Sequence, residues 1–307
     1  MTDPLPHASP SWQWGDWVLR FVIALQGLGV GGRYLFSSHE TESDVYGWLY
    51  FDHGWPEATA QRIDDVGAWA CCLASLFVVL GGWLAMPRGP VDRSQRRQRF
   101  GRYLEACAAI TVAVWVLALA ITHSLRGEIY AEWSLAEYAV RYGAPLSLLF
   151  LQRDGRMTAA ATMHRLGLGL LMLAAAVTFF LHGYKALQGY GPFTDLILLT
   201  DQNWSDFGWG QSFAESALVT IGIVDMLVAI LLLATRWRWL AIYMAFWGAL
   251  TAVSRITASG LSAWPETLIR AANWGAPLAI ACYLTYRSKA SSITIASKVS
   301  TARSSSP

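Results

Sequence analysis

Charged residues are scarce in this chain. Asp, Glu, Lys and Arg make up 14% of its 307 residues, whereas about 25% is usual in a soluble domain. Hydrophobic residues make up 54%, and they are gathered in repeated long apolar runs. This combination excludes an ordinary soluble domain and predicts an integral membrane protein. The 16 tryptophans agree with it, because Trp and Tyr collect at membrane interfaces.

Net charge and lysine are both low. A formal charge of +2 is too small to indicate a nucleic-acid partner. The only lysines are Lys185, Lys289 and Lys298, and of these only Lys185 lies in an apolar run. A lysine inside a membrane helix is costly unless it finds a partner, so Lys185 draws attention to the stretch that holds it.

Cysteine is also scarce, and its spacing excludes several cofactors. Cys71, Cys72, Cys107 and Cys282 all fall in apolar runs and make no C-x-x-C pair, which is typical of small buried side chains. No two histidines are spaced i, i+4, and no metal, haem, P-loop or dinucleotide pattern is present. We therefore predict no metal site; Gly27-x-Gly29 with Gly31 and Gly32 is expected to allow close helix packing instead.

No cleavable signal peptide is expected from the first residues of the sequence. Residues 1–16 hold two aspartates and three prolines but no basic region. We therefore expect a short cytoplasmic segment at 1–16, followed by an apolar run that stays in the membrane. At the other end, the Ser- and Thr-rich residues 288–307 are predicted to be a disordered cytoplasmic tail.

The apolar runs predict an all-α integral membrane fold with eight spans. The sixth and seventh spans are expected to form an antiparallel hairpin that turns at residues 236–238. The loops 37–64 and 188–214 are long and aromatic, and residues 193–200 are the best candidate for a short helix at the membrane surface. The predicted spans are 17–36, 66–86, 105–122, 135–152, 166–187, 215–235, 237–254 and 266–286.

The distribution of basic residues predicts the orientation. Arginines are concentrated at 88–102, 153–165 and 236–238, whereas the loops on the opposite side are rich in Asp and Glu. The basic side is expected to be cytoplasmic, which places both termini inside. The arginine-biased loops and the missing signal favour a bacterial inner membrane.

The chain also repeats itself. Tyr142-Gly-Ala-Pro-Leu146 returns as Trp274-Gly-Ala-Pro-Leu278, and the same offset pairs Trp115 with Trp247. Gly31-x-Arg33-x-Leu35 returns as Gly183-x-Lys185-x-Leu187. We therefore predict two tandem parallel four-helix repeats, at 17–152 and 166–287, joined by a cytoplasmic linker at 153–165.

The second repeat resembles the DoxX-like membrane proteins. The resemblance rests on His182-Gly-Tyr-Lys185 at the end of a first helix and on the Ile-Gly-x-x-Asp pattern from Ile221 to Asp225. It covers 164–286 best and is weaker in 17–152, which lacks that His and that Asp. The family includes a subunit of thiosulfate:quinone oxidoreductase, so the resemblance implies a four-helix fold and a redox-linked role.

The second repeat gathers an unusual set of polar residues for a membrane domain. We predict that they form one outward-facing polar cavity, in which Glu215, and also Asp225, neutralises Lys185 and Arg270. Two alternatives stay open: buried ion pairs that only fix helix packing, and snorkelling of Lys185 and Arg255 to the lipid headgroups. The candidate ligand-binding residues are His182, Lys185, Glu215, Asp225, Arg255, Arg270 and Asn273.

His182 has two readings of its own: it can relay a proton or bond a quinone carbonyl, or it can be a neutral histidine bonded to a backbone carbonyl. The first repeat is expected to scaffold this site, since it lacks a deep intramembrane carboxylate: Glu105 and Glu137 are expected near span ends.

Three functions remain compatible with the sequence, and none establishes an enzyme. The first is redox-linked binding of a quinone or small lipophile. The second is transport of a small solute. The argument against transport is that the predicted polar residues lie on one side of the membrane only. The third is a structural or assembly role beside a partner protein in a membrane complex.

Overall fold

The structure is a computed structural model that describes residues 10–36, 42–86, 91–127, 130–151 and 157–285. The described residues form helices joined by short turns, and no strand occurs among them. This is the fold expected of apolar runs in lipid, where a helix satisfies its own backbone hydrogen bonds. The all-α prediction is therefore confirmed. The predicted disordered tail at 288–307 lies outside the described residues.

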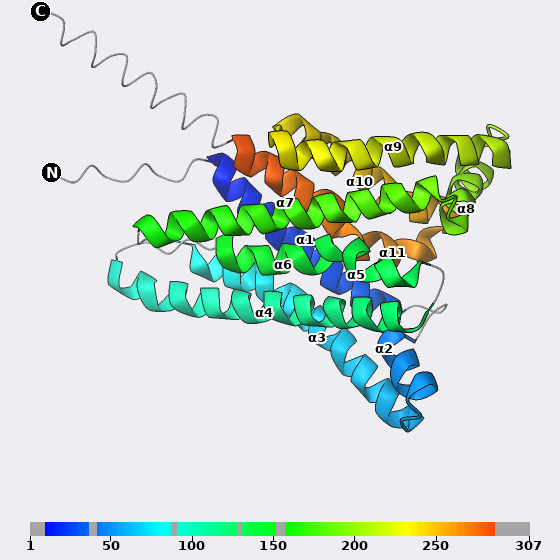
Figure 1. Cartoon of the computed structure of the whole chain (residues 1–307). Coiled ribbons are helices and arrows are strands. Elements are labelled where there is room, and N and C mark those ends of the chain that lie inside the picture. Colours follow the sequence, from blue (N-terminus) through cyan, green and yellow to red (C-terminus); the bar gives the residue numbers. More distant parts are fainter. Residues whose placement is uncertain (1–9, 37–41, 87–90, 128–129, 152–156, 286–307) are drawn as a thin grey trace, which may run out of the picture.

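Long helices alternate with short ones along the chain (Figure 1). The last helix, at residues 271–285, follows α11 after a turn at Arg270. The elements are α1 (Pro10–Leu35), α2 (Asp44–Gly47), a π-helix (Trp48–Asp52), α3 (Glu57–Ala85), α4 (Val91–Leu125), a 3-10 helix (Ala131–Trp133), α5 (Ser134–Glu137), α6 (Ala139–Leu151), α7 (Met157–Leu187), α8 (Gly191–Thr200), a second π-helix (Asp201–Ser205), α9 (Gln211–Thr235), α10 (Arg238–Ser259), a second 3-10 helix (Leu261–Ala263) and α11 (Trp264–Ile269).

Five of these helices are long and apolar enough to cross a membrane, within the described part of the chain. They coincide with five of the eight predicted spans and establish a multi-pass helical membrane protein in outline. The membrane-length segments are Glu57–Ala85, Gln95–Leu125, Thr162–Leu187, Gln211–Thr235 and Arg238–Ser259.

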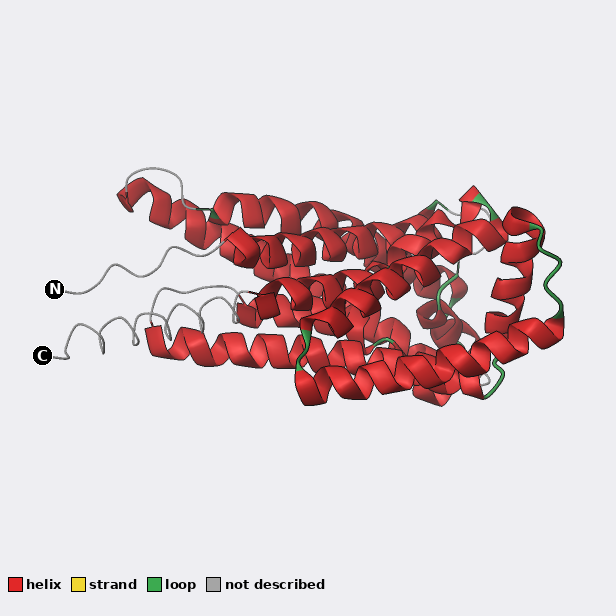
Figure 2. Ribbon diagram, turned by 90° about the horizontal axis from the view of Figure 1, so that it is seen from above, coloured by secondary structure: helices red, strands yellow, loops and turns green. Residues whose placement is uncertain are grey.

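The long helices run side by side, and both described chain ends lie at one end of the bundle (Figures 1 and 2). We call the opposite end, where α2, α5, α8 and α11 lie, the short-helix end. The turn between α9 and α10 is as tight as predicted: Arg236 adopts a left-handed conformation (φ 52°), and its N–H bonds the carbonyl of Leu232. The predicted surface helix at 193–200 is also present, as α8.

Several helices begin well before the predicted spans, and α3 already begins at Glu57. α7 already begins at Met157, so most of the predicted linker 153–165 is helical. α4 begins at Val91, which places Glu105 well inside that helix. Glu105 is fully buried, and its Oε1 lies 2.7 Å from Nε of Arg20.

Glycines on α1 allow the close packing predicted for them. A Cβ on Gly27 would lie 2.7 Å from the carbonyl oxygen of Cys71 on α3. A Cβ on Gly29 would lie 2.4 Å from the backbone nitrogen of Ile269 on α11. Since real Cβ atoms do not approach other atoms this closely, only glycine lets α1 pack against both neighbours.

Candidate functional site

Five of the seven predicted site residues line one cavity of about 390 Å³, which we call the α7–α10 cavity. They are His182, Asp225, Arg255, Arg270 and Asn273. The rest of the wall is largely apolar and aromatic, with contributions from Phe179, Phe193, Leu196, Ile197, Trp209, Phe213, Leu218, Ile221, Trp247 and Leu250. This size and composition fit a site for a small, mostly apolar molecule with a polar end.

Asp225 lines this cavity from the second half of α9. Its side chain is buried, with the residue 4% exposed. Oδ2 accepts a hydrogen bond from Nε1 of Trp247 at 3.3 Å, whereas Oδ1 has no partner among the described residues. A buried carboxyl with one neutral donor and no bonded cation is expected to carry its proton.

The backbone of α7 approaches α9 closely beside Asp225. A Cβ on Gly222 would lie 2.6 Å from the carbonyl oxygen of Gly183, and a Cβ on Gly183 would lie 2.7 Å from that of Gly222. The two glycines therefore set the separation of α7 and α9. That separation in turn fixes the distance between the cavity walls that carry His182 and Asp225.

Lys185 does not line this cavity. It is 3% exposed and forms a hydrogen-bonded ion pair with Oε2 of Glu137, which comes from α5. The same carboxylate lies 3.2 Å, through Oε1, from Nε2 of His182. The prediction that Glu215 neutralises Lys185 is wrong, and so is the alternative that Lys185 snorkels to the headgroups.

The Glu137 carboxylate therefore links α5 to two residues of α7, one of which faces the cavity. His182 therefore bonds a carboxylate and not the backbone carbonyl that one of its two predicted roles required. A carboxylate that orients a histidine is an arrangement that can hold or pass a proton.

Arg270 is neutralised by its neighbour on α11 and not by Glu215 or Asp225. Its Nη1 bonds both the side chain and the backbone carbonyl of Glu266. The other oxygen of Glu266 lies 2.7 Å from Nη1 of Arg33 on α1. Glu215 lies apart on the exposed start of α9, where it accepts a hydrogen bond from Gln211.

Arg255 and Asn273 contribute unsatisfied polar atoms to the α7–α10 cavity. Nε of Arg255 and Oδ1 of Asn273 are buried and have no hydrogen-bond partner within the described part of the chain. Together with Oδ1 of Asp225, they give the apolar cavity three groups that can bond a ligand. Buried polar atoms in native proteins are normally paired, so these are candidates for ligand contact.

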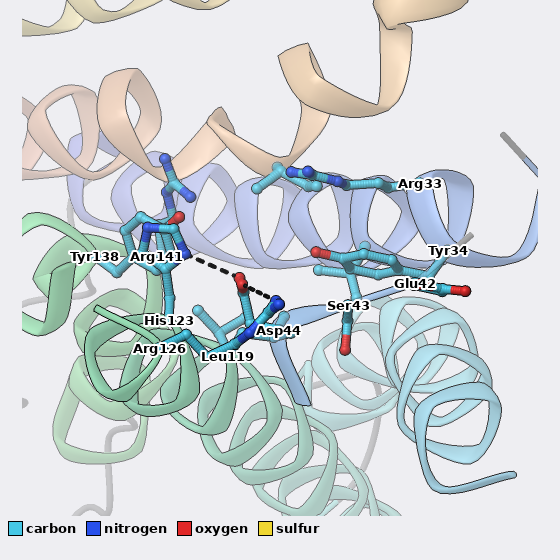
Figure 3. A pocket seen from close by; sticks show the side chains of 13 residues that line it. Arg33, Tyr34, Glu42, Ser43, Asp44, Leu119, His123, Arg126, Tyr138 and Arg141 are labelled. Atoms are coloured by element: carbon cyan, nitrogen blue, oxygen red, sulfur yellow. Dashed lines mark hydrogen bonds and ion pairs between the residues drawn. The ribbon is translucent and has the colours of Figure 1, made fainter. Parts of the chain in front are cut away.

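A second cavity, of about 500 Å³, was not predicted from the sequence; we call it the α1–α4 cavity (Figure 3). It lies at the same end of the bundle and is lined by Val30, Arg33, Tyr34, Glu42, Ser43, Asp44, Val116, Leu119, His123, Arg126, Tyr138, Arg141 and Ile269. In the sequence, its charges look like ordinary loop-side residues because they come from four separate stretches. The expectation that the first half only scaffolds overlooked this cavity.

Asp44 holds one wall of the α1–α4 cavity together. It bonds Nδ1 of His123 at 3.1 Å and Nη1 of Arg126 at 3.3 Å (Figure 3). Burial by itself would raise the pKa of this carboxyl, but the hydrogen bond with His123 and the neighbouring positive charges lower the pKa below its usual value. Asp44 is therefore ionised at neutral pH and compensates the cations beside it.

A metal site finds no support in the side chains: no group of three His, Cys, Asp or Glu residues suited to a metal ion occurs among those described. Comparison of the chain with models of known families, with characterised proteins and with solved structures gives no significant match.

Proposed function

We propose that this chain is an eight-span membrane protein made of two tandem parallel four-helix repeats, of which the second is DoxX-like. The order of elements supports the duplication. In each half, a long helix is followed by a short helix that runs into a π-helix, then by two long helices, a 3-10 helix, a short helix and a final helix. Such an order recurring in one chain is expected from duplication of one unit.

Two ion pairs support the same duplication. Arg33 and Lys185 occupy equivalent places in the repeated Gly-x-basic-x-Leu motif. Each binds an acid from the other half: Arg33 binds Glu266 and Lys185 binds Glu137. This exchange of partners across the boundary is what a pseudo-twofold arrangement of two repeats requires.

The proposed orientation places both termini in the cytoplasm of a bacterial cell and the protein in its inner membrane. Its support is the position of the basic residues, since Arg236 and Arg238 lie at the same end of the bundle as the chain ends. The short-helix end and both cavities then face outward.

We propose that the α7–α10 cavity binds a quinone or a similar small lipophile as part of a redox-linked system. The observation that carries this is an apolar cavity that holds a buried carboxyl with a free oxygen, Oδ1 of Asp225. A protonated carboxyl can donate a hydrogen bond to a quinone carbonyl, while the aromatic walls exclude water.

The residues of the cavity supply a route for protons to and from such a ligand. Asp225 would give a proton to a carbonyl oxygen that gains charge. His182 lines the same cavity and is bonded to Glu137, so it is a second group that can pass a proton to or from the ligand. In this proposal the electrons come from a redox partner in the same membrane.

Binding of tritiated decylubiquinone to the purified protein in an uncharged detergent tests this proposal. We expect Asp225→Leu to lower the affinity by about tenfold or more, because it removes the hydrogen bond to the carbonyl. Asp225→Asn keeps a donor and should retain most of the binding. Asp195→Leu is the matched control, because Asp195 is exposed on α8 and does not line the cavity. Equal binding by the wild type and a folded Asp225→Leu variant would refute the proposed contact.

A further inference from the structure

The α1–α4 cavity occupies the place in the first half that the α7–α10 cavity occupies in the second. The offset that pairs Gly31 with Gly183 also pairs Val30 with His182 and Tyr34 with Ala186. The offset that pairs Trp115 with Trp247 relates a further five lining positions, pairing Val116 with Gly248, Leu119 with Thr251, His123 with Arg255, Tyr138 with Arg270 and Arg141 with Asn273. Each of these residues lines its own cavity, so the two cavities lie at equivalent positions in the two halves of the chain.

The chemistry of the two walls is different. The α1–α4 cavity is lined by three arginines, a histidine and two tyrosines, with Asp44 and Glu42 as its acids (Figure 3). Two of the arginines have ion-pair partners: Arg33 binds Glu266, and Arg126 binds Asp44. The third, Arg141, is different.

Arg141 is a buried cation without a bonded anion. The residue is 4% exposed, it takes part in no ion pair within the described residues, and its Nε has no hydrogen-bond partner. Its guanidinium lies over the ring of Tyr138, at 4.1 Å from the ring centroid. Gln26 anchors the same segment by donating a hydrogen bond from Nε2 to the Arg141 carbonyl at 2.9 Å. The backbone of Arg141 is thus anchored beside the cavity, its guanidinium stacks on Tyr138, and its Nε is left without a hydrogen-bond partner among the described residues.

A buried guanidinium of this kind is costly unless an anion compensates it. Its planar donors match the oxygens of a carboxylate, phosphate or sulfate group, which it can bind through two parallel hydrogen bonds. Tyr34 and Tyr138, which line the same cavity, offer hydroxyl donors for a third contact. The cavity of about 500 Å³ is large enough for a small molecule that carries such a group.

We propose that the α1–α4 cavity binds an oxyanion, with Arg141 as its principal ligand and Arg33, Arg126 and the two tyrosines around it. The oxyanion is either a free small anion or the phosphate headgroup of a lipid that enters from the membrane surface. The protein then has two sites of related origin and opposite character, one for an oxyanion and one for an apolar molecule.

Calorimetric titration of the full-length protein with inorganic phosphate, at constant ionic strength in an uncharged detergent, tests the free-anion arm. We expect the wild type to bind and Arg141→Gln to lose at least about tenfold in affinity, the loss of one charge-assisted contact. Arg236→Gln is the control, because it removes an exposed arginine at the opposite end of the bundle. Thermal unfolding shows whether Arg141→Gln is folded, and Tyr34→Phe, which removes one hydroxyl, gives a milder second variant.

Native mass spectrometry from nanodiscs that contain phosphatidylglycerol in phosphatidylcholine tests the lipid arm. Phosphatidylglycerol retained by the wild type and lost from Arg141→Gln would assign the oxyanion to a lipid headgroup. The proposal is overturned if the wild type retains neither ligand, or if Arg141→Gln retains them as the wild type does. These outcomes are independent of the quinone titration, because the two cavities share no lining residue.

Discussion

Lys185→Ala is expected to lower the free energy of unfolding by roughly 3–5 kcal/mol, which is the loss typical of breaking a buried ion pair. The substitution leaves the Glu137 carboxylate buried, with His182 as its remaining partner. Glu137→Ala should be as damaging, because it leaves the Lys185 ammonium group buried without an anion. Chemical unfolding in mixed micelles measures both losses.

The double variant Lys185→Met/Glu137→Leu shows whether the loss in each single variant comes from the unpaired charge that it leaves buried. It removes both charges and keeps apolar volume, so we expect it to recover most of the stability lost in either single variant. Glu215→Ala is the matched control: among the described residues the exposed Glu215 bonds Gln211 alone, and its loss should cost within about 0.5 kcal/mol. A Lys185→Ala variant as stable as the wild type, together with an unstable Glu215→Ala variant, would restore the pairing predicted from the sequence.

Gly222→Leu is expected to destabilise the protein by roughly 1–3 kcal/mol and to deform the α7–α10 cavity. Its side chain would enter the space held by the Gly183 carbonyl and the Leu187 side chain, so α7 and α9 would have to separate. Asp225 lies one turn further along α9 and would move with that helix. Thermal unfolding and quinone binding measured on the same preparation report the two effects.

Gly169→Leu is the matched control for this substitution. Gly169 lies on α7, as Gly183 does, but nothing lies within 4 Å of a Cβ built on it. Leucine there should be neutral or slightly stabilising, because glycine is the poorer helix former. If both substitutions had the same small effect, the close approach of α7 and α9 would not matter for stability.

Helix positions and the membrane class could be predicted from the sequence because they depend on local composition. Apolar runs, the tight turn at Arg236 and the short helix α8 all follow from residues that are neighbours in the chain. Five residues of the α7–α10 cavity could be grouped for a similar reason. The number of residues along a helix gives the depth of a side chain in the membrane. Polar side chains at similar depth in neighbouring helices tend to face one another.

The ion-pair partners of the site residues could not be predicted, because the depth of a residue along its helix does not show which helices are in contact. The partner of Lys185 was sought within its own half, whereas α5 reaches α7 from the other half and brings Glu137 to it. Glu215 looked suitable because it opens α9 at the same end, yet its side chain points away into an exposed position. The ion pair between Lys185 and Glu137 joins residues 48 positions apart in the chain, so the sequence pattern did not indicate it.

The α1–α4 cavity was missed although the sequence held a signal for it. The alignment of the two halves already pairs His123 with Arg255, and the same offset takes Arg141 onto Asn273. A polar cavity expected around the second member of each pair implies one around the first. Only the fold brings Asp44 and Arg126 beside them, because Asp44 begins α2 and Arg126 directly follows α4.

The central claim is that the α7–α10 cavity holds a small lipophile, and mass spectrometry of small molecules extracted from the gently solubilised protein tests it most directly. The wild type is compared with Ala217→Trp, which fills the cavity from α9, and with Ile223→Trp, which adds the same ring to the exposed face of that helix. The account predicts a quinone or other lipophile in the wild type and in Ile223→Trp, and none in Ala217→Trp. The same molecule recovered in equal amount from all three folded proteins, or from none of them, would contradict it.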